Sequence, residues 1–160
     1  ALSPTYGGGS VLGFDLATGR EEIRRRSELL THRTRLYEEL SARENLELFA
    51  DLLGISRDRV GEALERVALV DVADERVRTF SAGMRQKVAV ARAIVRDPEL
   101  LLLDEPTTGL DAAARQAVDD MMLRASREGR TLVIATHHGV APGLAARVVT
   151  MRDGSVETGS

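Results

Sequence analysis

The sequence has no cysteine, and Lys87 is the only lysine among its 160 residues. Without cysteine, disulfides and thiolate metal sites are excluded. No apolar run approaches the roughly 20 residues of a membrane-spanning helix, and no N-terminal stretch has the residue order of a secretory signal. The net charge of −3 gives no reason to expect nucleic-acid binding. Hydrophobic residues make up 43% of the chain. This composition and the chain length predict one globular domain with a hydrophobic core.

Helical patterns occupy the middle of the chain. Ser41 and Glu44 have the spacing of a capping box, and Gly54 is suited to end the helix that follows. A second helix is expected to start at Ser56. A third is expected to run from Ser81 to the Asp97-Pro98 pair, where proline disfavours a helical residue before it.

The last third of the chain alternates strand and helix. Residues 100–103 are four leucines, as expected for a strand buried on both faces of a parallel sheet. A helix over 112–128 and a strand over 131–136 follow, and residues 148–157 read as a hairpin with an Asp-Gly turn. Near the start, residues 11–16 predict a further strand.

These patterns predict an α/β fold with a mostly parallel sheet and an inserted helical region. We expect residues 1–37 and 99–160 to form the α/β core of a single domain. Residues 38–98 are expected to form the helical subdomain.

Two adjacent carboxylates, Asp104 and Glu105, follow the leucine strand. The carboxyl edge of a parallel sheet is where open α/β folds bind ligands. An aspartate there can hold Mg²⁺ beside nucleotide phosphates, and a glutamate can polarise a water for attack. For two acids alone, a solvated strand end is an equally good interpretation.

Four segments place this acidic pair in a wider pattern, which resembles the ATP-binding-cassette (ABC) ATPases. In chain order they are Phe80-Ser81-Ala82-Gly83-Met84-Arg85-Gln86, LLLLDEP at 100–106, Thr108-Gly109-Leu110-Asp111, and Val133-Ile134-Ala135-Thr136-His137. They resemble the signature loop, the Walker B strand, the D-loop and the switch-histidine strand of that family. The resemblance implies a P-loop NTPase-type ABC fold that uses ATP and Mg²⁺.

The resemblance also implies catalytic roles. Asp104 would hold the metal, Glu105 would be the catalytic base, and His137 would contact the γ-phosphate. A lone histidine at a strand end is otherwise commonly a surface residue. A metal site at His137-His138 is not expected, because neighbouring strand residues point to opposite faces and no partner ligand is suitably spaced.

The signature-like segment Ser81-Ala82-Gly83-Met84 lies at an expected helix start, where free N–H groups favour an anion. Taken alone, this pattern is an ordinary helix N-cap. By resemblance, these four residues and Asp111 would contact ATP, with the signature loop closing on nucleotide bound to a partner subunit. Ala82 and Met84 replace the glycine and glutamine usual in the family.

His32 falls where the family has its Q-loop glutamine, so the loop would contact nucleotide through a histidine instead. This histidine and the following pattern are similar to haem-exporter ATPases of cytochrome c maturation. The form Phe80-Ser81-x-Gly83-Met84-Arg85-Gln86-Lys87 also resembles drug and polysaccharide exporter ATPases.

The P-loop sequence G-x-x-x-x-G-K-[ST] does not occur in these residues, since Lys87 follows no glycine loop. Pro4-Thr5-Tyr6-Gly7 resembles a stretch found shortly after the P-loop helix in the family. We therefore expect an N-terminally truncated ABC domain.

The resemblance implies an ATPase subunit that dimerises head to tail with a second ABC subunit and drives export through transmembrane permease subunits. It would lie on the cytoplasmic face of the membrane, and no nucleic-acid partner is expected. Two alternatives remain open: a catalytically incompetent partner that supplies only its signature face, and a non-transport ABC protein of translation or DNA repair.

Overall fold

The computed structural model describes residues 6–31, 33–137, 142–144 and 147–157. Three parallel strands form its central sheet in the order β3-β4-β5, with β4 in the middle. The elements run in chain order as β1 (Ser10–Val11), β2 (Phe14–Asp15), α1 (Arg20–Arg26), β3 (Ser27–Leu30), α2 (Ala42–Leu53), α3 (Asp58–Arg66), α4 (Ala82–Arg96), β4 (Leu100–Asp104), α5 (Ala112–Arg127), β5 (Thr131–Ala135), β6 (Thr150–Arg152) and β7 (Ser155–Glu157), with short 3₁₀ turns at Val70–Val72 and Val77–Thr79.

The local signals at the helix ends act as the sequence predicts. Ser41 and Glu44 form the reciprocal capping box of α2, and Gly54 ends that helix in the left-handed conformation at φ 67°. Ser81 caps α4 by accepting a hydrogen bond from the Met84 N–H. The second predicted helix is also confirmed, although α3 begins at Asp58, two residues after Ser56.

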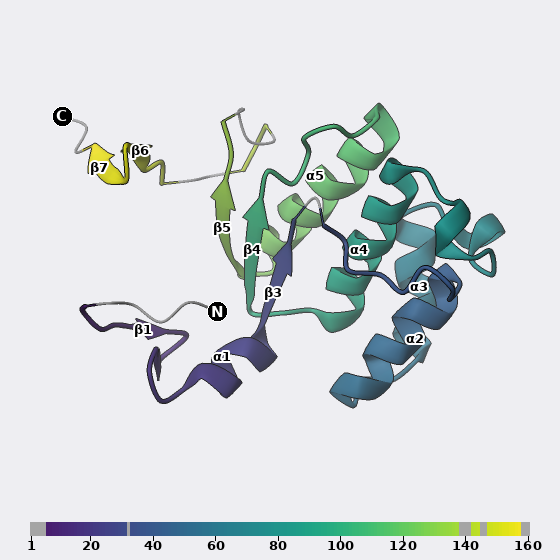
Figure 1. Ribbon diagram of the computed structural model, residues 1–160, viewed down its shortest axis with the longest axis horizontal. Coiled ribbons are helices and arrows are strands. Elements are labelled where there is room, and N and C mark those ends of the chain that lie inside the picture. Colours follow the sequence, from purple (N-terminus) through teal and green to yellow (C-terminus); the bar gives the residue numbers. More distant parts are fainter. Residues whose placement is uncertain (1–5, 32, 138–141, 145–146, 158–160) are drawn as a thin grey trace.

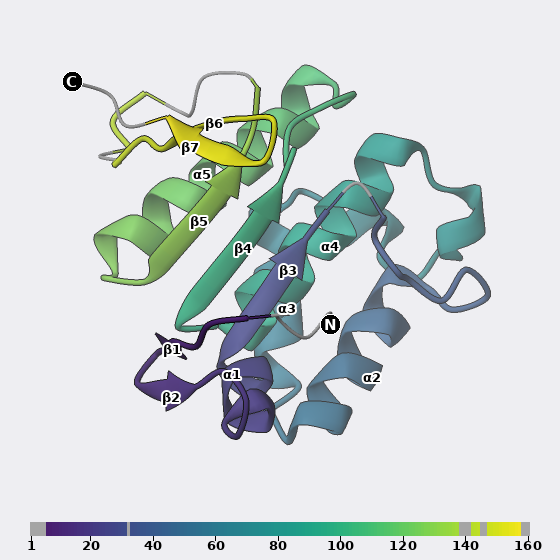
Figure 2. The same cartoon turned by 60° about the vertical axis from the view of Figure 1, so that its left-hand side comes forward.

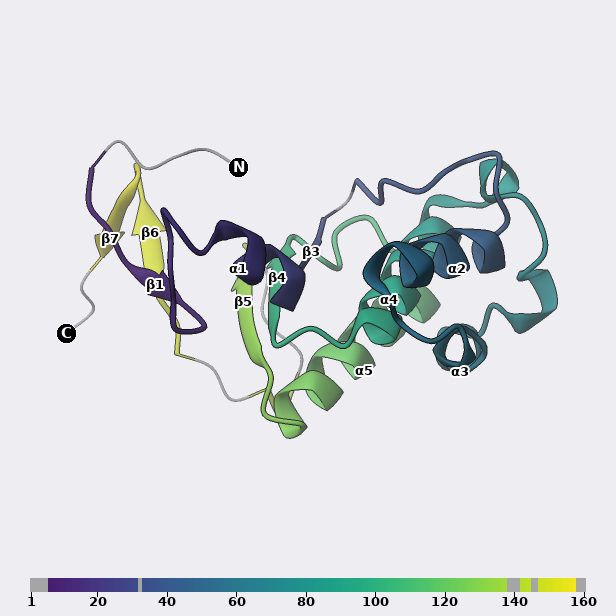
Figure 3. The same ribbon diagram turned by 90° about the horizontal axis from the view of Figure 1, so that it is seen from below.

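Helices α2 to α5 all lie on one side of the sheet (Figures 1 and 3), with α4 and α5 nearest to it. The inner stripe of α5 contains Ala114, Val118 and Met121, all of them buried. Helix α4 is buried along most of its length, because it packs against β3, α2, α3 and α5. The core of the described residues is therefore centred on α4, next to the sheet.

The prediction of burial on both faces of the leucine strand is wrong for part of it. Leu101 and Leu103 point toward the helices and are 2% exposed, whereas Leu102 is only partly buried. Its register partners on either side, Leu29 and Val133, are 45% and 55% exposed. The apolar run fits a central strand, but within the described residues helices cover only one face of the sheet.

A buried ionic cluster fixes α4 against β3. Glu28 bonds Arg92 at 2.9 Å and Arg96 at 2.7 Å, and all three side chains are largely buried. Arg92 also donates to the Thr34 carbonyl at 3.0 Å and stacks over the Phe49 ring at 4.9 Å. Arg92 thus links three parts of the chain: the sheet, helix α2 and the loop that follows β3.

Two small hairpins lie on the side of the sheet away from α2 to α5, as Figures 1 and 3 show. The predicted strand over 11–16 is wrong: Leu12 and Gly13 adopt positive φ and turn the chain back, so β1 pairs antiparallel with β2. The predicted closing hairpin is confirmed in β6 and β7, and its Asp153-Gly154 turn has two positive φ values.

The three central strands run in the same direction in Figure 2, so their carboxyl ends share one edge of the sheet. Among the described residues, no helix has the length and apolar character needed to cross a bilayer.

Candidate functional site

The backbone turns sharply where β4 ends. Asp104 pairs with Ala135 as the last residue of the β4 register. Glu105 then adopts a left-handed conformation at φ 45° while its N–H still donates to the Ala135 carbonyl at 2.9 Å. A non-glycine residue is rarely held there unless its surroundings fix it. The sheet therefore determines the position of Glu105 closely.

The Glu105 carboxylate is bonded on both oxygens. Its Oε1 accepts from the His137 N–H at 2.9 Å and lies 2.6 Å from His137 Nδ1. Its Oε2 accepts from the Thr108 hydroxyl at 3.0 Å and from the Thr136 hydroxyl at 3.4 Å. The carboxylate thereby joins the end of β4 to the segment that follows β5.

These contacts lower the pKa of Glu105. The hydrogen bond with the His137 ring is the main cause, and bonds from Thr108 and the His137 N–H add to it. Desolvation, second in size to the His137 ring bond, raises the pKa but is outweighed by the bonds together. Glu105 is therefore held as the carboxylate, the form that can accept a proton.

Asp104 differs from Glu105 in having its carboxylate exposed. None of the described residues donates a hydrogen bond to that carboxylate or forms an ion pair with it. A hard cation such as Mg²⁺ prefers such oxygen ligands and usually keeps several waters. No group of three or more histidine, cysteine, aspartate or glutamate side chains in the described segments could hold a metal ion. Asp104 therefore suits a metal ion whose remaining ligands are waters and substrate oxygens.

The signature-like residues meet the D-loop-like residues at two helix starts. Asp111 caps α5 through Oδ1, which accepts from the Ala114 N–H at 2.8 Å. Its Oδ2 faces Gly83, where an added Cβ would lie only 2.9 Å away. Gly83 is buried by this contact, whereas Ser81 and Ala82 are exposed at the start of α4.

A small cavity of about 230 Å³ brings several of the predicted residues together. Ala82 lies on one wall, and Glu105 and Thr108 lie on another. Met84 is partly buried in the first turn of α4. The remaining predicted site residue, His32, lies outside the described residues. So does His138, at which no site was expected.

Sequence reasoning missed three members of this region. Thr108 and Thr136 both donate to Glu105, and the buried Gln86 lines the small cavity. Thr108 was within reach of sequence reasoning, because it lies only three residues after Glu105. Thr136 was not, since its partner is 31 residues away.

A parallel α/β sheet with an acidic pair at the carboxyl end of its central strand is the arrangement that nucleotide hydrolases use to place Mg²⁺ beside phosphates. Comparison with known proteins then gives the family. The chain belongs to the ABC transporter family, whose model matches residues 2–108.

Individual relatives agree with this assignment. The daunorubicin resistance ATP-binding protein DrrA3 of Streptomyces coeruleorubidus is 39% identical over 160 residues, covering 97% of this chain and 51% of that protein. The ABC transporter ATP-binding protein NatA of Bacillus subtilis is 38% identical over 141 residues, covering 85% and 57%. The chain thus spans about half the length of these relatives.

A solved structure shares the fold. The dimeric post-hydrolysis state of the ATP-binding cassette MJ0796, bound to ADP and Pi, matches with a TM-score of 0.73 and 28% identity. The match covers 84% of this chain and 64% of that one. The predicted fold class, an ABC ATPase fold with a parallel sheet and helices, is confirmed by this similarity.

Proposed function

We propose that this chain forms part of an ATP-hydrolysing subunit of an ABC transporter, with Glu105 as the base that activates water. The observation that carries the proposal is the Glu105 carboxylate, fixed by backbone and side-chain bonds and kept ionised at the carboxyl edge of the sheet. Family membership and the relatives' names support the assignment to a transporter.

One of the hydrogen bonds to Glu105 must break before its carboxylate can accept a proton from water. A carboxylate has about four lone-pair sites, and all four are used by His137, Thr108 and Thr136. Thr108 and His137 are exposed, so an arriving water can replace either contact without opening the core. The site is therefore set to exchange an internal hydrogen bond for one to the attacking water.

The short contact of His137 Nδ1 with Glu105 favours a proton on that nitrogen. The other ring nitrogen then accepts in the neutral ring and donates only in the doubly protonated ring. A contact to a γ-phosphate oxygen would therefore use the charged form of His137. Asp104 would hold Mg²⁺, which supplies charge neutralisation at the phosphates.

We propose a head-to-tail dimer in which Ser81 to Met84 and Asp111 face ATP held by a second ABC subunit. The start of α4 supports this role, because Ser81 and Ala82 are exposed there at the positive end of the helix. The dimeric MJ0796 cassette, described as bound to ADP and Pi, supports both the dimer and the nucleotide. His32 would contribute from the loop after β3.

We further propose export through transmembrane permease subunits, with the ATPase on the cytoplasmic face of the membrane. Residues 38–98 would form its helical subdomain. The relatives named for daunorubicin resistance support an exporter of the drug-resistance kind. The resemblance to haem exporters stays a prediction.

The test is ATP hydrolysis by the natural protein that contains this chain, assembled with its membrane partner. Glu105→Gln keeps the size and most of the hydrogen bonds but removes the base, so turnover should fall by about 100-fold or more. ATP binding should remain. Glu75→Gln is the matched control, because Glu75 is exposed and lies between the two 3₁₀ turns, outside the candidate site. Equal turnover in the Glu105 and Glu75 variants would remove Glu105 from this role.

The second candidate is a partner subunit that supplies only its signature face. The exposed Ser81 and Ala82 at the start of α4 are the observation that favours it. In that case Glu105→Gln should leave the turnover of the heterodimer unchanged, whereas Ser81→Arg should reduce it. The two variants together separate the candidates.

A further inference from the structure

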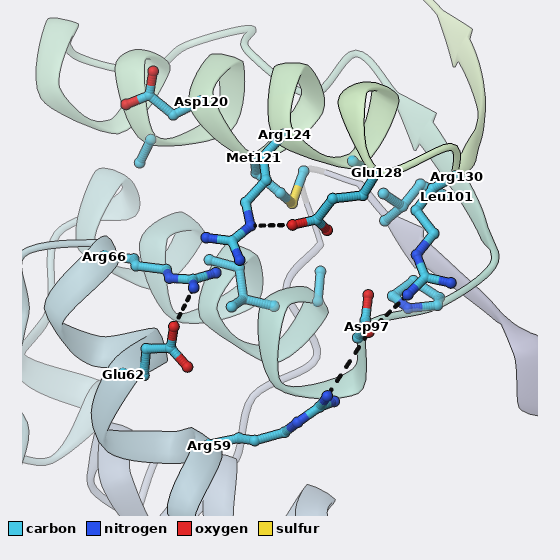
Figure 4. A pocket seen from close by; sticks show the side chains of 15 residues that line it. Arg59, Glu62, Arg66, Asp97, Leu101, Asp120, Met121, Arg124, Glu128 and Arg130 are labelled. Carbon is cyan, nitrogen blue, oxygen red and sulfur yellow. Dashed lines mark hydrogen bonds and ion pairs between the residues drawn. The ribbon is translucent and has the colours of Figure 1, made fainter.

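A second and larger cavity lies between α3, the end of α4 and α5, and Figure 4 shows its lining. Its volume is about 520 Å³, within the range of small-molecule sites. It reaches Leu101 near the start of β4, whereas Asp104 and Glu105 lie at the other end of that strand. This α3–α5 cavity is therefore separate from the candidate active site.

The α3–α5 cavity combines an apolar surface with four guanidinium groups. Its apolar lining consists of Ala93, Ile94, Pro98, Leu101, Ala117, Met121 and Ala125. Its basic lining consists of Arg59 and Arg66 from α3, Arg124 from α5, and Arg130 just after α5. An occupant must therefore offer apolar area to the helices and a polar group to the arginines.

The carboxylates of this lining already have partners. Asp97 bonds Arg130 at 2.8 Å and lies 3.8 Å from Arg59. Glu128 bonds Arg124 at 2.7 Å, and Glu62 bonds Arg66. Asp120, the remaining acid, accepts from Gln116 at 2.8 Å. Three of these four acids are already neutralised by an arginine of the same lining.

Hydrogen-bond donors, in contrast, are in surplus. Each guanidinium has five N–H groups, and only one nitrogen of Arg66 and one of Arg124 bond a carboxylate. Arg130 Nε is buried and has no partner among the described residues. Acceptor oxygens of a ligand would satisfy such donors, and a planar guanidinium binds an acidic group through two parallel bonds.

Arg66 and Arg124 are the arginines best placed to hold an anionic group. In Figure 4 their guanidinium ends approach one another across the cavity, one from α3 and one from α5. Each is paired only with an acid four residues further along or back in the chain, Glu62 within α3 and Glu128 directly after α5, and those acids are exposed. Such surface pairs are weak, so a ligand can replace them readily.

We propose that the α3–α5 cavity binds a small organic anion with an apolar body, its acidic group between Arg66 and Arg124. The apolar body lies against Ala117, Met121 and Leu101. This site is independent of ATP chemistry, because none of its lining residues belongs to the candidate active site.

The test uses 8-anilinonaphthalene-1-sulfonate, an aromatic sulfonate with an apolar body, titrated into the 160-residue chain. Binding is followed by fluorescence, and the methionine methyl groups are followed by carbon-13 NMR. The Met121 methyl resonance should shift on saturation, whereas those of Met84 and Met151, which lie outside the cavity, should not. Absence of a Met121 shift would overturn the proposal even if fluorescence rises.

Variants locate the binding further. Arg66→Gln combined with Arg124→Gln should weaken binding by about tenfold or more, and Ala117→Phe should block the cavity. The matched controls are Arg115→Gln combined with Arg127→Gln, and Ala113→Phe, all on α5 but outside the lining. If the lining variants bind as tightly as their controls, the proposal is wrong.

Discussion

At the scale of single residues, the Glu105 carboxylate is the group on which the proposed function depends. Four hydrogen-bonding contacts from three residues hold it, and its backbone is fixed by the sheet. These contacts favour the ionised form and lower its pKa. The same contacts that hold the group in place therefore also keep it in its basic form.

The first prediction concerns the dependence of this residue on pH. Because the pKa is lower in the folded chain, the contacts stabilise the fold at pH values above the ordinary glutamate pKa. That contribution is lost as the pH falls through the lowered pKa. His137→Ala removes the main cause, so the pKa of Glu105 should rise toward its ordinary value. The measurement is a carbon-13 NMR titration of the Glu105 carboxyl group.

A pair of neighbouring threonines supplies the control for that titration. Thr108→Val removes a hydroxyl that donates to Glu105, so it should also raise the pKa. Thr107→Val removes a hydroxyl that does not hydrogen-bond Glu105 and should leave the titration unchanged. A Glu105 pKa that is the same in all four proteins would contradict the assigned cause.

The sequence predicted the candidate site in part. Asp104 and Glu105 were predicted because an apolar strand ending in acids is a local pattern. The hydroxyl partners were not, because Thr136 reaches Glu105 only once β5 pairs with β4. Contacts between residues distant in the chain depend on strand register, which no local pattern contains.

At the scale of elements, α4 and α5 begin side by side, and a glycine allows it. Asp111 caps α5 with one oxygen and approaches Gly83 of α4 with the other. A side chain at position 83 would push Asp111 away from its capping position. The two helix starts therefore depend on each other.

A comparison of two helical glycines tests this dependence. Gly61→Ala in α3 should stabilise the chain by about 0.5–1 kcal/mol, because its added methyl group meets open space. Gly83→Ala should instead destabilise it by about 1 kcal/mol, the value of a lost N-cap bond. Both changes are measured by chemical denaturation.

A third variant isolates the cause. Asp111→Ser keeps a capping hydroxyl but removes the oxygen that faces Gly83. In the Asp111→Ser background, Gly83→Ala should lower the free energy of unfolding by measurably less than in the unchanged chain. A double-mutant cycle detects this difference. An equal cost in both backgrounds would show that the contact with Asp111 is not responsible.

Most elements were predictable because their signals are local. The capping box of α2 and the cap of α4 were read directly from residue spacing, and both are present. The prediction of a strand over 11–16 was wrong, because the chain turns at Leu12, whose positive φ follows from no evident turn pattern in the sequence. The partial exposure of Leu102 was also missed, because burial depends on which helices cover the sheet.

At the scale of the whole molecule, the described residues supply the acidic edge and the signature-like helix start but no lysine that follows a glycine-rich loop. Lys87, the sole lysine, lies within α4. ABC ATPases hold the phosphates mainly with a glycine-rich loop and its lysine. We therefore predict that the 160-residue chain alone binds Mg²⁺–ATP weakly or not at all, as measured by calorimetry.

The variant Asp104→Asn serves as the control for that measurement. Its binding heats should match those of the unchanged chain if no specific site is complete. Micromolar affinity that Asp104→Asn reduces would contradict the prediction and show that these residues suffice for binding.

The ordering of the sheet has a consequence for how the chain folds. Neighbouring strands β3 and β4 are separated by about 70 residues of sequence, whereas β4 and β5 are separated by about 26. Closing the longer loop costs about 0.9 kcal/mol more in chain entropy. Helices α2 to α4 fill that interval, and the Glu28 cluster ties α4 to β3. We therefore expect β4 and β5, which are joined by the shorter loop, to pair first. Packing of α2 to α4 would then shorten the loop between β3 and β4, so that β3 joins the sheet last.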